Sequence, residues 1–140
     1  MTGQRNSVKI FGAVEIYTSC FLYKRDRVFN ADTYGGFLED IARRFRRQGA
    51  LLVQDNASYH KERGIWSWFK ANRHWLKVYP LPPYSPELNA TERMWQHTRR
   101  NGTHNRYFKT EDELVGTLTR VFGAMQEKPE IISGYLRPFC

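Results

Sequence analysis

Cysteine is scarce in this sequence, in which Cys20 and Cys140 are far apart and neither lies in a CxxC or Cys/His pattern. This scarcity argues against a disulfide framework and against a structural zinc site. No apolar run approaches the roughly 20 residues of a membrane-spanning helix. The opening residues, MTGQRNSVKIF, also lack the charged-then-apolar layout of a secretion signal. We therefore expect a cytoplasmic protein that does not associate with membranes.

Acidic residues are also in deficit, with 14 Asp+Glu against 22 Lys+Arg and a formal net charge of +8. Such an excess suits a polyanionic partner, because each Lys or Arg placed against a phosphate releases condensed counterions. Many stable domains are simply basic, so charge alone favours nucleic acid only slightly. Apolar material is plentiful, since hydrophobic residues make up 41% of the 140 residues. The chain can therefore build one core, and we expect a single domain over residues 1–140.

Alternation of apolar and other residues predicts a hairpin near the start of the chain. The strand expected over residues 8–17 has four apolar side chains on one face: Val8, Ile10, Val14 and Ile16. Thr18 and Ser19 can turn the chain into a second strand over residues 20–25. A helix is expected next, capped by Asp32 or Thr33 and stopped by Gly49.

The rest of the chain alternates short apolar runs with helical patterns. Residues 50–53 form a short apolar run that is followed by Gln54 and Asp55. This pattern is typical of a buried strand with a carboxylate at its C-terminal end. The following elements are expected in this order: a helix over 61–75, a strand over 76–79 parallel to the Asp55 strand, a proline-dense loop over 80–86, a helix over 89–100, and a helix that a capping box opens at Thr110. This order predicts an α/β layer fold with a mixed sheet.

Two carboxylates stand out by their position. Asp55 ends a strand, and Glu92 lies 92 − 55 = 37 positions later in the first turn of a helix. The strand-helix-strand segment between them can return the chain to the same edge of the sheet, where open α/β sheets place ligand sites. Carboxylates meeting there suit Mg²⁺, which prefers oxygen ligands. The spacing alone is explained at least as well by a turn at Asp55 and a capping box from Asn89 to Glu92.

The residues around both carboxylates form a more specific sequence pattern. The segments QDNASYH (54–60) and LPPYSPELNATERMW (81–95) resemble the catalytic segments of the insertion-sequence branch of the mariner-like DDE transposases. In that family they read roughly DNAxxH and PPYSPxLNPxExxW. The similarity extends through residues 11–14, 23–25 and 103–108, and so covers most of the chain. The resemblance implies a ribonuclease-H-like mixed sheet flanked by helices.

The resemblance also implies roles for particular residues. Asp55 would be the second metal-binding carboxylate and Glu92 the third, with Asn56 and His60 supporting the site. The metal would be Mg²⁺, and Mn²⁺ should substitute because both accept oxygen ligands. The reaction would be phosphodiester hydrolysis at a transposon end followed by strand transfer to target DNA. DNA of the nucleoid would be the partner.

Basic residues follow Glu92 at short intervals. Arg93, Arg99 and Arg100 lie close to the expected site, which favours contacts to DNA phosphates. The alternative is a solvated helix face, with arginines near the helix C-terminus favoured by the helix dipole. His97 is expected to be an ordinary structural residue.

Two features depart from the family pattern. Ala90 stands where the family usually has proline, a change confined to the start of a helix. The family's first catalytic Asp lies on a central strand that precedes the hairpin, whereas the first acidic residue here is Glu15, inside the hairpin. We therefore expect the first strand to be missing. Unpaired buried backbone groups cost about 1–3 kcal/mol each. We therefore expect the strand edges left by the missing strand to be paired in one of three ways: by the hairpin pairing with the Asp55 strand, by a homodimer or other partner chain, or by a separate fragment.

Two other functions compete with an active transposase core. One is a catalytically dead remnant or split-frame fragment that folds and binds DNA non-specifically without cutting it. The other is a non-enzymatic interaction module that acts through the proline loop and the basic helices. Metal-dependent nicking of DNA separates an active core from the dead remnant. A structure with Asp55 and Glu92 far apart and their side chains only in caps would favour the interaction module.

Overall fold

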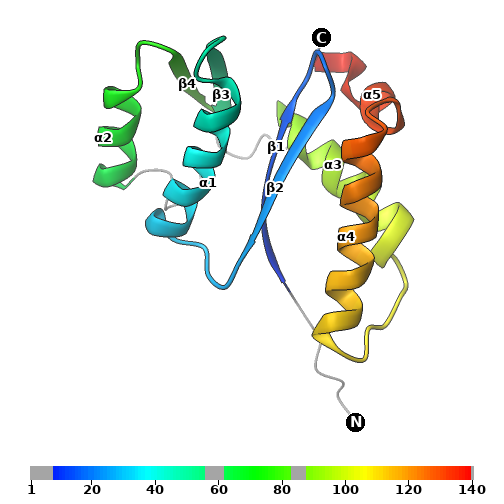
Figure 1. Cartoon of the computed structure of the whole chain (residues 1–140). Helices are drawn as coiled ribbons and strands as arrows, with labels where there is room; N and C mark the ends of the chain where they lie inside the picture. The colour runs from blue at the N-terminus through cyan, green and yellow to red at the C-terminus, as the bar shows by residue number, and fades with distance from the viewer. Residues whose placement is uncertain (1–7, 56–61, 83–87, 140) are drawn as a thin grey trace. The chain divides into compact units, whose positions relative to one another are not determined.

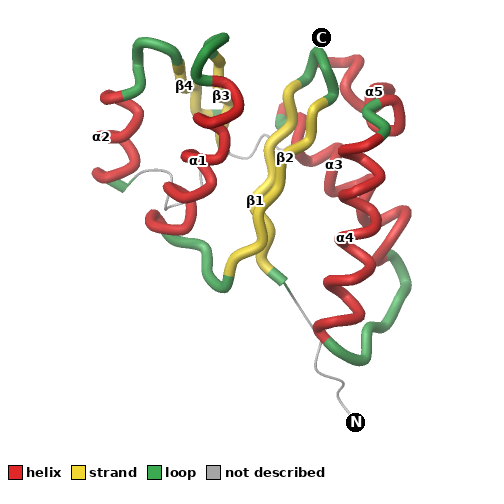
Figure 2. Tube along the Cα trace, viewed as in Figure 1, coloured by secondary structure: helices red, strands yellow, loops and turns green. Residues whose placement is uncertain are grey.

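The computed structural model describes residues 8–55, 62–82 and 88–139, and the chain forms two compact units. One unit consists of Met1–Arg27 with Ala90–Cys140, and the other is Val28–Asn89. Each unit contains a two-stranded sheet among the described residues, with helices packed on it (Figures 1 and 2).

The first unit opens with the predicted hairpin. Strands β1 (Lys9–Glu15) and β2 (Cys20–Asp26) pair in antiparallel register. The Glu15 carboxylate stabilises the turn between them, because it accepts hydrogen bonds from the backbone N–H groups of Tyr17 at 3.0 Å and Thr18 at 2.7 Å. The expected hairpin is confirmed, with each strand end within two residues of the predicted one.

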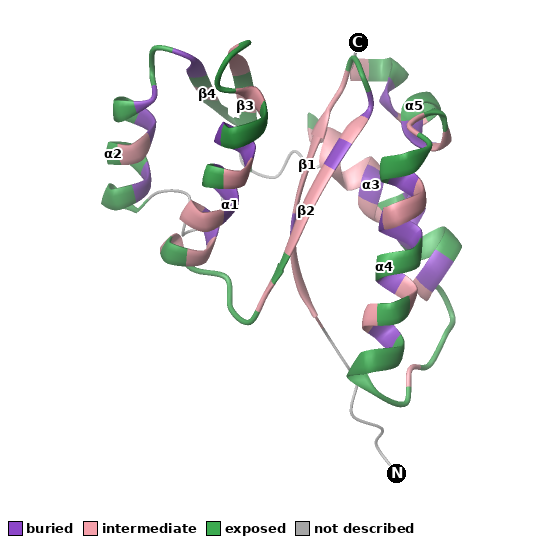
Figure 3. Cartoon of the chain, in the orientation of Figure 1, coloured by how far each residue is buried: buried purple, intermediate pink, exposed green. Residues whose placement is uncertain are grey.

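Helices complete this unit: α3 (Ala90–Thr98), the π-helical turn η3 (Arg99–Thr103), α4 (Glu111–Glu127), α5 (Glu130–Leu136) and the short turn η4 (Arg137–Phe139). Their apolar side chains and the hairpin form one core: Phe21, Met94, Leu114, Leu118, Val121, Phe122, Met125, Ile132 and Leu136. The four alternating residues expected on one hairpin face, from Val8 to Ile16, pack against this core, which confirms that prediction. Buried positions recur along α4 between exposed ones, as an amphipathic helix requires (Figure 3).

The second unit is a crossover of strands and helices: α1 (Ala31–Phe45), β3 (Ala50–Gln54), α2 (Arg63–Ala71) and β4 (Leu76–Pro80). Strands β3 and β4 are parallel, with Gln54 opposite Pro80 at their carboxyl ends. The predicted parallel pairing is therefore confirmed. It places the residue after β3, Asp55, and the start of the proline-rich segment at the same edge of the sheet.

Strand β3 is paired along one edge. The Gln54 carbonyl accepts a hydrogen bond from the Leu81 N–H group at 2.7 Å, so the backbone of Gln54 faces β4. Backbone groups of successive residues in a strand point to opposite edges, so those of Leu51 and Val53 face away from β4. Within the part of the chain that the structure describes, no strand pairs with that edge. The side chains of Leu51 and Val53 are 60% and 47% exposed.

The start of α1 differs from the prediction, which placed the cap at Asp32 or Thr33. The N-cap is Asn30, whose side-chain oxygen accepts the Thr33 N–H at 2.9 Å. The Asn30 N–H in turn donates to the Thr33 hydroxyl at 3.0 Å, a reciprocal capping box. The end of the helical segment was predicted correctly, since Gly49 has a positive φ of 84° and its N–H bonds back to the carbonyl of Phe45.

The predicted extent of α2 is wrong, because the helix ends at Ala71 and does not continue to Trp75. The Asn72 side chain stops it: its amide donates to the Trp68 carbonyl at 2.8 Å, and its oxygen accepts the Trp75 indole N–H at 2.8 Å. This pairing buries Trp75 in the turn that leads into β4. Among the described residues, no helix combines the length and the apolar character needed to cross a membrane.

Candidate functional site

Asp55 follows β3 directly, and two contacts hold the backbone before it. Gln54, 5% exposed, accepts a buried hydrogen bond from the Tyr34 hydroxyl on α1 at 2.7 Å. Its carbonyl is bonded to Leu81, just beyond β4. Because these contacts anchor the tip of β3 to a helix and to the neighbouring strand, Asp55 is presented from a rigid position, and its side chain is exposed. Sequence reasoning did not find Tyr34 as a support for this edge.

Glu92 lies in the first turn of α3 and is half-buried. The capping box that competed with a metal role would require the Glu92 carboxylate to accept the Asn89 N–H. No such hydrogen bond occurs among the described residues. The carboxylate is therefore not used to cap its own helix and remains available for a ligand.

Trp95 anchors α3 on the hairpin of the same unit. Its ring packs edge-on against Phe21 and Phe122, with centroid separations of 6.0 and 6.2 Å. The ring also lies over Gly12 of β1, where a Cβ atom would sit 2.7 Å from Trp95 Cζ2 and still closer to Cη2. A larger residue at position 12 would therefore require the Trp95 ring or the strand to shift.

The two carboxylates belong to different units, Asp55 to the second and Glu92 to the first. Asn56 and His60 lie outside the described residues. Among residues 8–55, 62–82 and 88–139, no group of three or more His, Cys, Asp or Glu side chains could hold a metal ion. The donor chemistry of Asp55 and Glu92 nevertheless fits Mg²⁺ or Mn²⁺, because carboxylate oxygens are the ligands that these ions prefer.

Arg93, Arg99 and Arg100 follow Glu92 along α3 and η3. Arg93 donates to the Gln96 side chain at 3.4 Å, and Arg100 donates to the Tyr135 hydroxyl at 3.3 Å. None of the three forms an ion pair with a carboxylate within the described parts of the chain. Their charge is therefore not neutralised locally, which suits contact with a polyanion.

His97 is 8% exposed beneath this basic stretch. Its Nδ1 lies 3.2 Å from the Asn101 amide nitrogen, and its ring meets Tyr135 edge-on at 5.5 Å. Burial, and then the positive charge of Arg100, lower the pKa of His97 below its ordinary value. His97 is thus a neutral structural residue at pH 7, in agreement with the sequence-based expectation.

The lowered pKa of His97 predicts a loss of stability in acid. Because the folded state binds the proton less readily than the unfolded state, the free energy of unfolding should fall once the pH drops below about 6.5, the ordinary pKa of histidine. Urea denaturation at pH 7.5 and pH 5.5 measures the change. Over this pH interval His97→Gln should lose less stability than wild type. The control His74→Gln, at an exposed site, should lose as much stability as wild type. Equal losses in wild type and His97→Gln would remove His97 as the cause.

Comparison with known proteins identifies relatives over most of the chain. Residues 1–115 match a family model described as DDE superfamily endonuclease. An uncharacterized protein of Sinorhizobium fredii, y4pE/y4sA, is 41% identical over 92 residues, which are 65% of this chain and 64% of that protein. The Tcb2 transposase of Caenorhabditis briggsae is 28% identical over 109 residues, 70% of this chain and 39% of the transposase. The insertion element IS630 39 kDa protein of Shigella sonnei, also uncharacterized, is 36% identical over 69 residues, 49% of this chain and 20% of that protein. The chain thus spans less than two thirds of each of these relatives.

Solved structures share the fold at low sequence identity. The Mos1 transposase catalytic domain, solved with Raltegravir and Mg, superposes with a TM-score of 0.63 at 15% identity, over 93% of this chain and 78% of that one. The catalytic core domain of BIV integrase gives a TM-score of 0.62 at 17% identity, over 97% of this chain and 90% of that one. The fold is therefore the ribonuclease-H-like α/β fold of transposase and integrase catalytic cores, as the sequence predicted.

Proposed function

The chain belongs to the DDE superfamily endonucleases, and from that premise we propose that it is the catalytic core of a DNA transposase. Its reaction is metal-dependent hydrolysis of a phosphodiester at a transposon end, followed by attack of the freed 3′ hydroxyl on target DNA. The observation that carries the proposal is the position of Asp55. It is exposed at the carboxyl end of β3, beside the point where the chain leaves β4 towards α3 and Glu92.

In this proposal residues 1–140 belong to one catalytic domain, in which Asp55 and Glu92 are the metal-binding carboxylates. Asp55 and Glu92 would hold Mg²⁺, or Mn²⁺ in its place, which would activate the attacking hydroxyl and stabilise the leaving oxygen. Asn56 and His60 support the site from the segment after Asp55. The residues that follow Glu92, Arg93, Arg99 and Arg100, hold DNA phosphates in register without reading sequence. The substrate would be DNA of the nucleoid, in the cytoplasm.

The proposed activity is tested by incubating the chain with supercoiled plasmid and Mg²⁺ or Mn²⁺. Nicking that requires the metal and stops with a chelator is the expected result, since both steps need a divalent cation. DNA binding measured in parallel, in the presence of Ca²⁺, separates recognition from cleavage. Metal-independent nicking, or nicking that survives excess chelator, would contradict the proposal.

A catalytically dead fragment that binds DNA without cutting it is the second candidate. One observation favours it: Glu15, the first acidic residue of the chain, uses its carboxylate to accept hydrogen bonds from the hairpin turn. It is therefore not available as an additional metal ligand. The same plasmid assay decides between the candidates, because this reading expects DNA binding with no nicking in either metal.

We also propose that the outer edge of β3 takes a strand from a second copy or another chain. Leu51 and Val53 turn their backbone groups to this edge, and both side chains are exposed. The strand ALLVQ contains no charge or proline, the devices that normally protect an exposed edge, whereas β4 contains both Lys77 and Pro80. Its composition is that of a strand with neighbours on both sides.

Sheet completion by a second copy predicts a dimer that a charge at the edge disrupts. Sedimentation over a range of concentrations should show dimers of the wild type, because four apolar side chains, Leu51 and Val53 of each copy, leave water together. Val53→Lys should remain monomeric, and Leu88→Lys, at an exposed site outside β3, should behave as wild type. The proposal that another strand pairs with the outer edge of β3 would be contradicted if the wild type is monomeric and its stability does not increase when a separate strand is added.

A further inference from the structure

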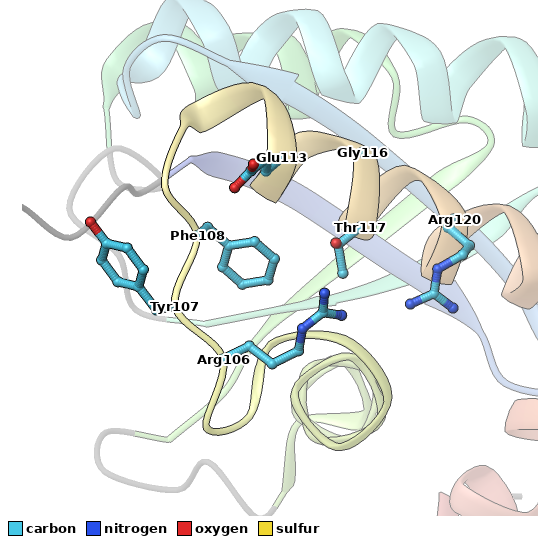
Figure 4. Close-up of a pocket in the computed structure, with 7 residues that line it drawn as sticks. All are labelled: Arg106, Tyr107, Phe108, Glu113, Gly116, Thr117 and Arg120. Atoms are coloured by element: carbon cyan, nitrogen blue, oxygen red, sulfur yellow. The ribbon is translucent and has the colours of Figure 1, made fainter.

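An open depression of about 460 Å³ lies in the first unit, and none of its lining residues belongs to α3. It is lined by a segment before α4, residues 106–108, and by one face of α4 (Figure 4). The helical lining residues recur at spacings of three and four and therefore share a face: Glu113, Gly116, Thr117 and Arg120. The depression is formed entirely within one unit and contains neither Asp55 nor Glu92.

Two arginines give the depression its charge. Arg106 and Arg120 are exposed, and neither forms an ion pair within the described ranges. Figure 4 shows both side chains extending to the part of the depression beside Thr117. The acidic residue of the lining, Glu113, is already engaged, because its carboxylate accepts the Lys109 N–H at 2.9 Å in the cap of α4. The end formed by Arg106, Thr117 and Arg120 thus offers two cations and a hydroxyl to an anion.

Contacts within the segment before α4 hold Arg106 in place. One guanidinium nitrogen donates to the Gly102 carbonyl at 3.3 Å, and the guanidinium carbon lies 5.2 Å from the centre of the Phe108 ring. A guanidinium has five N–H donors, so several remain for a ligand. Because the side chain is oriented before a ligand arrives, it loses little conformational freedom on binding.

Tyr107, another lining residue, carries an aromatic ring that is 71% exposed and that lies on the other side of the segment from Phe108 (Figure 4). Exposed aromatic rings beside cationic side chains are the usual components of single-stranded nucleic acid sites, where unpaired bases stack on the ring and phosphates contact the cations. A base pair in a duplex does not offer its face to such a ring. The presence of Tyr107 together with Arg106 and Arg120 in the lining therefore favours single-stranded nucleic acid over a duplex.

We propose that this depression binds single-stranded nucleic acid, with a backbone phosphate held by Arg106, Arg120 and the Thr117 hydroxyl, and with an unpaired base stacked on Tyr107. The site is additional to the proposed cutting site and rests on the proposed function only in the choice of DNA as the probe. A nucleic acid strand in this depression would be bound to the same unit that carries Glu92.

Fluorescence anisotropy with a labelled 20-nucleotide oligo-dT and a duplex of the same length tests the site. Tyr107→Ala should weaken binding of the single strand by about 5-fold or more, the value of one stacked base, and leave duplex binding unchanged. Arg106→Gln and Arg120→Gln should each weaken single-strand binding and reduce the slope of log affinity against log salt by about 0.7. Arg73→Gln and Tyr17→Ala, at exposed positions outside the depression, are the matched controls.

The pattern of losses decides the proposal. It is overturned if Tyr107→Ala weakens single-strand and duplex binding equally, if it weakens neither, or if Arg120→Gln behaves like Arg73→Gln. Thermal melting of each variant shows whether the fold is retained, and the exposure of Tyr107 and both arginines makes retention the expected result. Plasmid nicking is measured on the same variants. A chain that never nicks but shows the predicted losses would refute the transposase reaction and leave this site standing.

Discussion

Asp55→Asn is expected to reduce metal-dependent nicking by at least about 100-fold, a loss of roughly 2.7 kcal/mol of transition-state stabilisation. The amide keeps the size of the side chain and removes the negative charge that a divalent cation requires. Glu92→Gln should cause a loss of the same order for the same reason. Initial rates of plasmid nicking at saturating Mg²⁺ measure both effects.

Matched substitutions separate a metal role from a general loss of negative charge. Asp32→Asn and Glu127→Gln alter exposed acids in α1 and α4 and should keep wild-type nicking rates. DNA binding in Ca²⁺ should survive in all four variants, because the proposed phosphate contacts come from arginines. Nicking by Asp55→Asn at the wild-type rate would end the assignment of a metal to this residue.

Gly12→Ala is expected to lower the free energy of unfolding by about 1–3 kcal/mol, the usual cost of overpacking a core. The added Cβ atom would lie 2.7 Å from Trp95 Cζ2, so either the indole ring or the strand must move. Trp95 belongs to the helix that carries Glu92, and displacement of that helix should lower nicking as well. Chemical denaturation monitored by tryptophan fluorescence measures the stability.

Gly123→Ala provides a control of opposite sign. Gly123 lies inside α4, and a Cβ atom there meets nothing within 4 Å. Since glycine costs about 0.5–1 kcal/mol relative to alanine inside a helix, this change should stabilise the protein. If the Gly12 contact with Trp95 is the cause, Trp95→Phe should also make Gly12→Ala less costly in a double-mutant cycle. An equal cost of Gly12→Ala in both backgrounds would remove the contact as the explanation.

Much of the fold could be predicted because neighbouring residues encode it. Alternation specified the hairpin face from Val8 to Ile16. The Thr-x-x-Glu spacing specified the start of α4, where the Thr110 side chain accepts the Glu113 N–H, although the Glu113 carboxylate accepts the N–H of Lys109 in place of the reciprocal capping-box bond. The apolar run before Asp55 specified a strand, and its parallel pairing with β4 followed from the helix between them. These features depend on contacts within a few residues, or on a connection that leaves one topology.

Other features were not fixed by the sequence pattern. Asn30, Asp32 and Thr33 all offer capping side chains within four residues, and the structure shows that Asn30 is the cap, with Thr33 returning the hydrogen bond. The end of α2 at Ala71 depends on Asn72 reaching the Trp75 indole, a contact that helical periodicity does not encode. The depression around Arg106 and Arg120 was missed because its two cations are 14 positions apart (120 − 106) and meet only when α4 presents one face to the preceding segment.

The amino-acid sequence by itself determined the family, the identity of the two candidate carboxylates and the order of strands and helices, because motif letters and periodicity are properties of adjacent residues. Tertiary structure alone decided that Glu92 does not cap its own helix, that Tyr34 holds the tip of β3, and that a Cβ atom at position 12 would meet the Trp95 ring. Those outcomes depend on distant segments competing for the same hydrogen bonds and the same space, and such competition is resolved only when the chain packs.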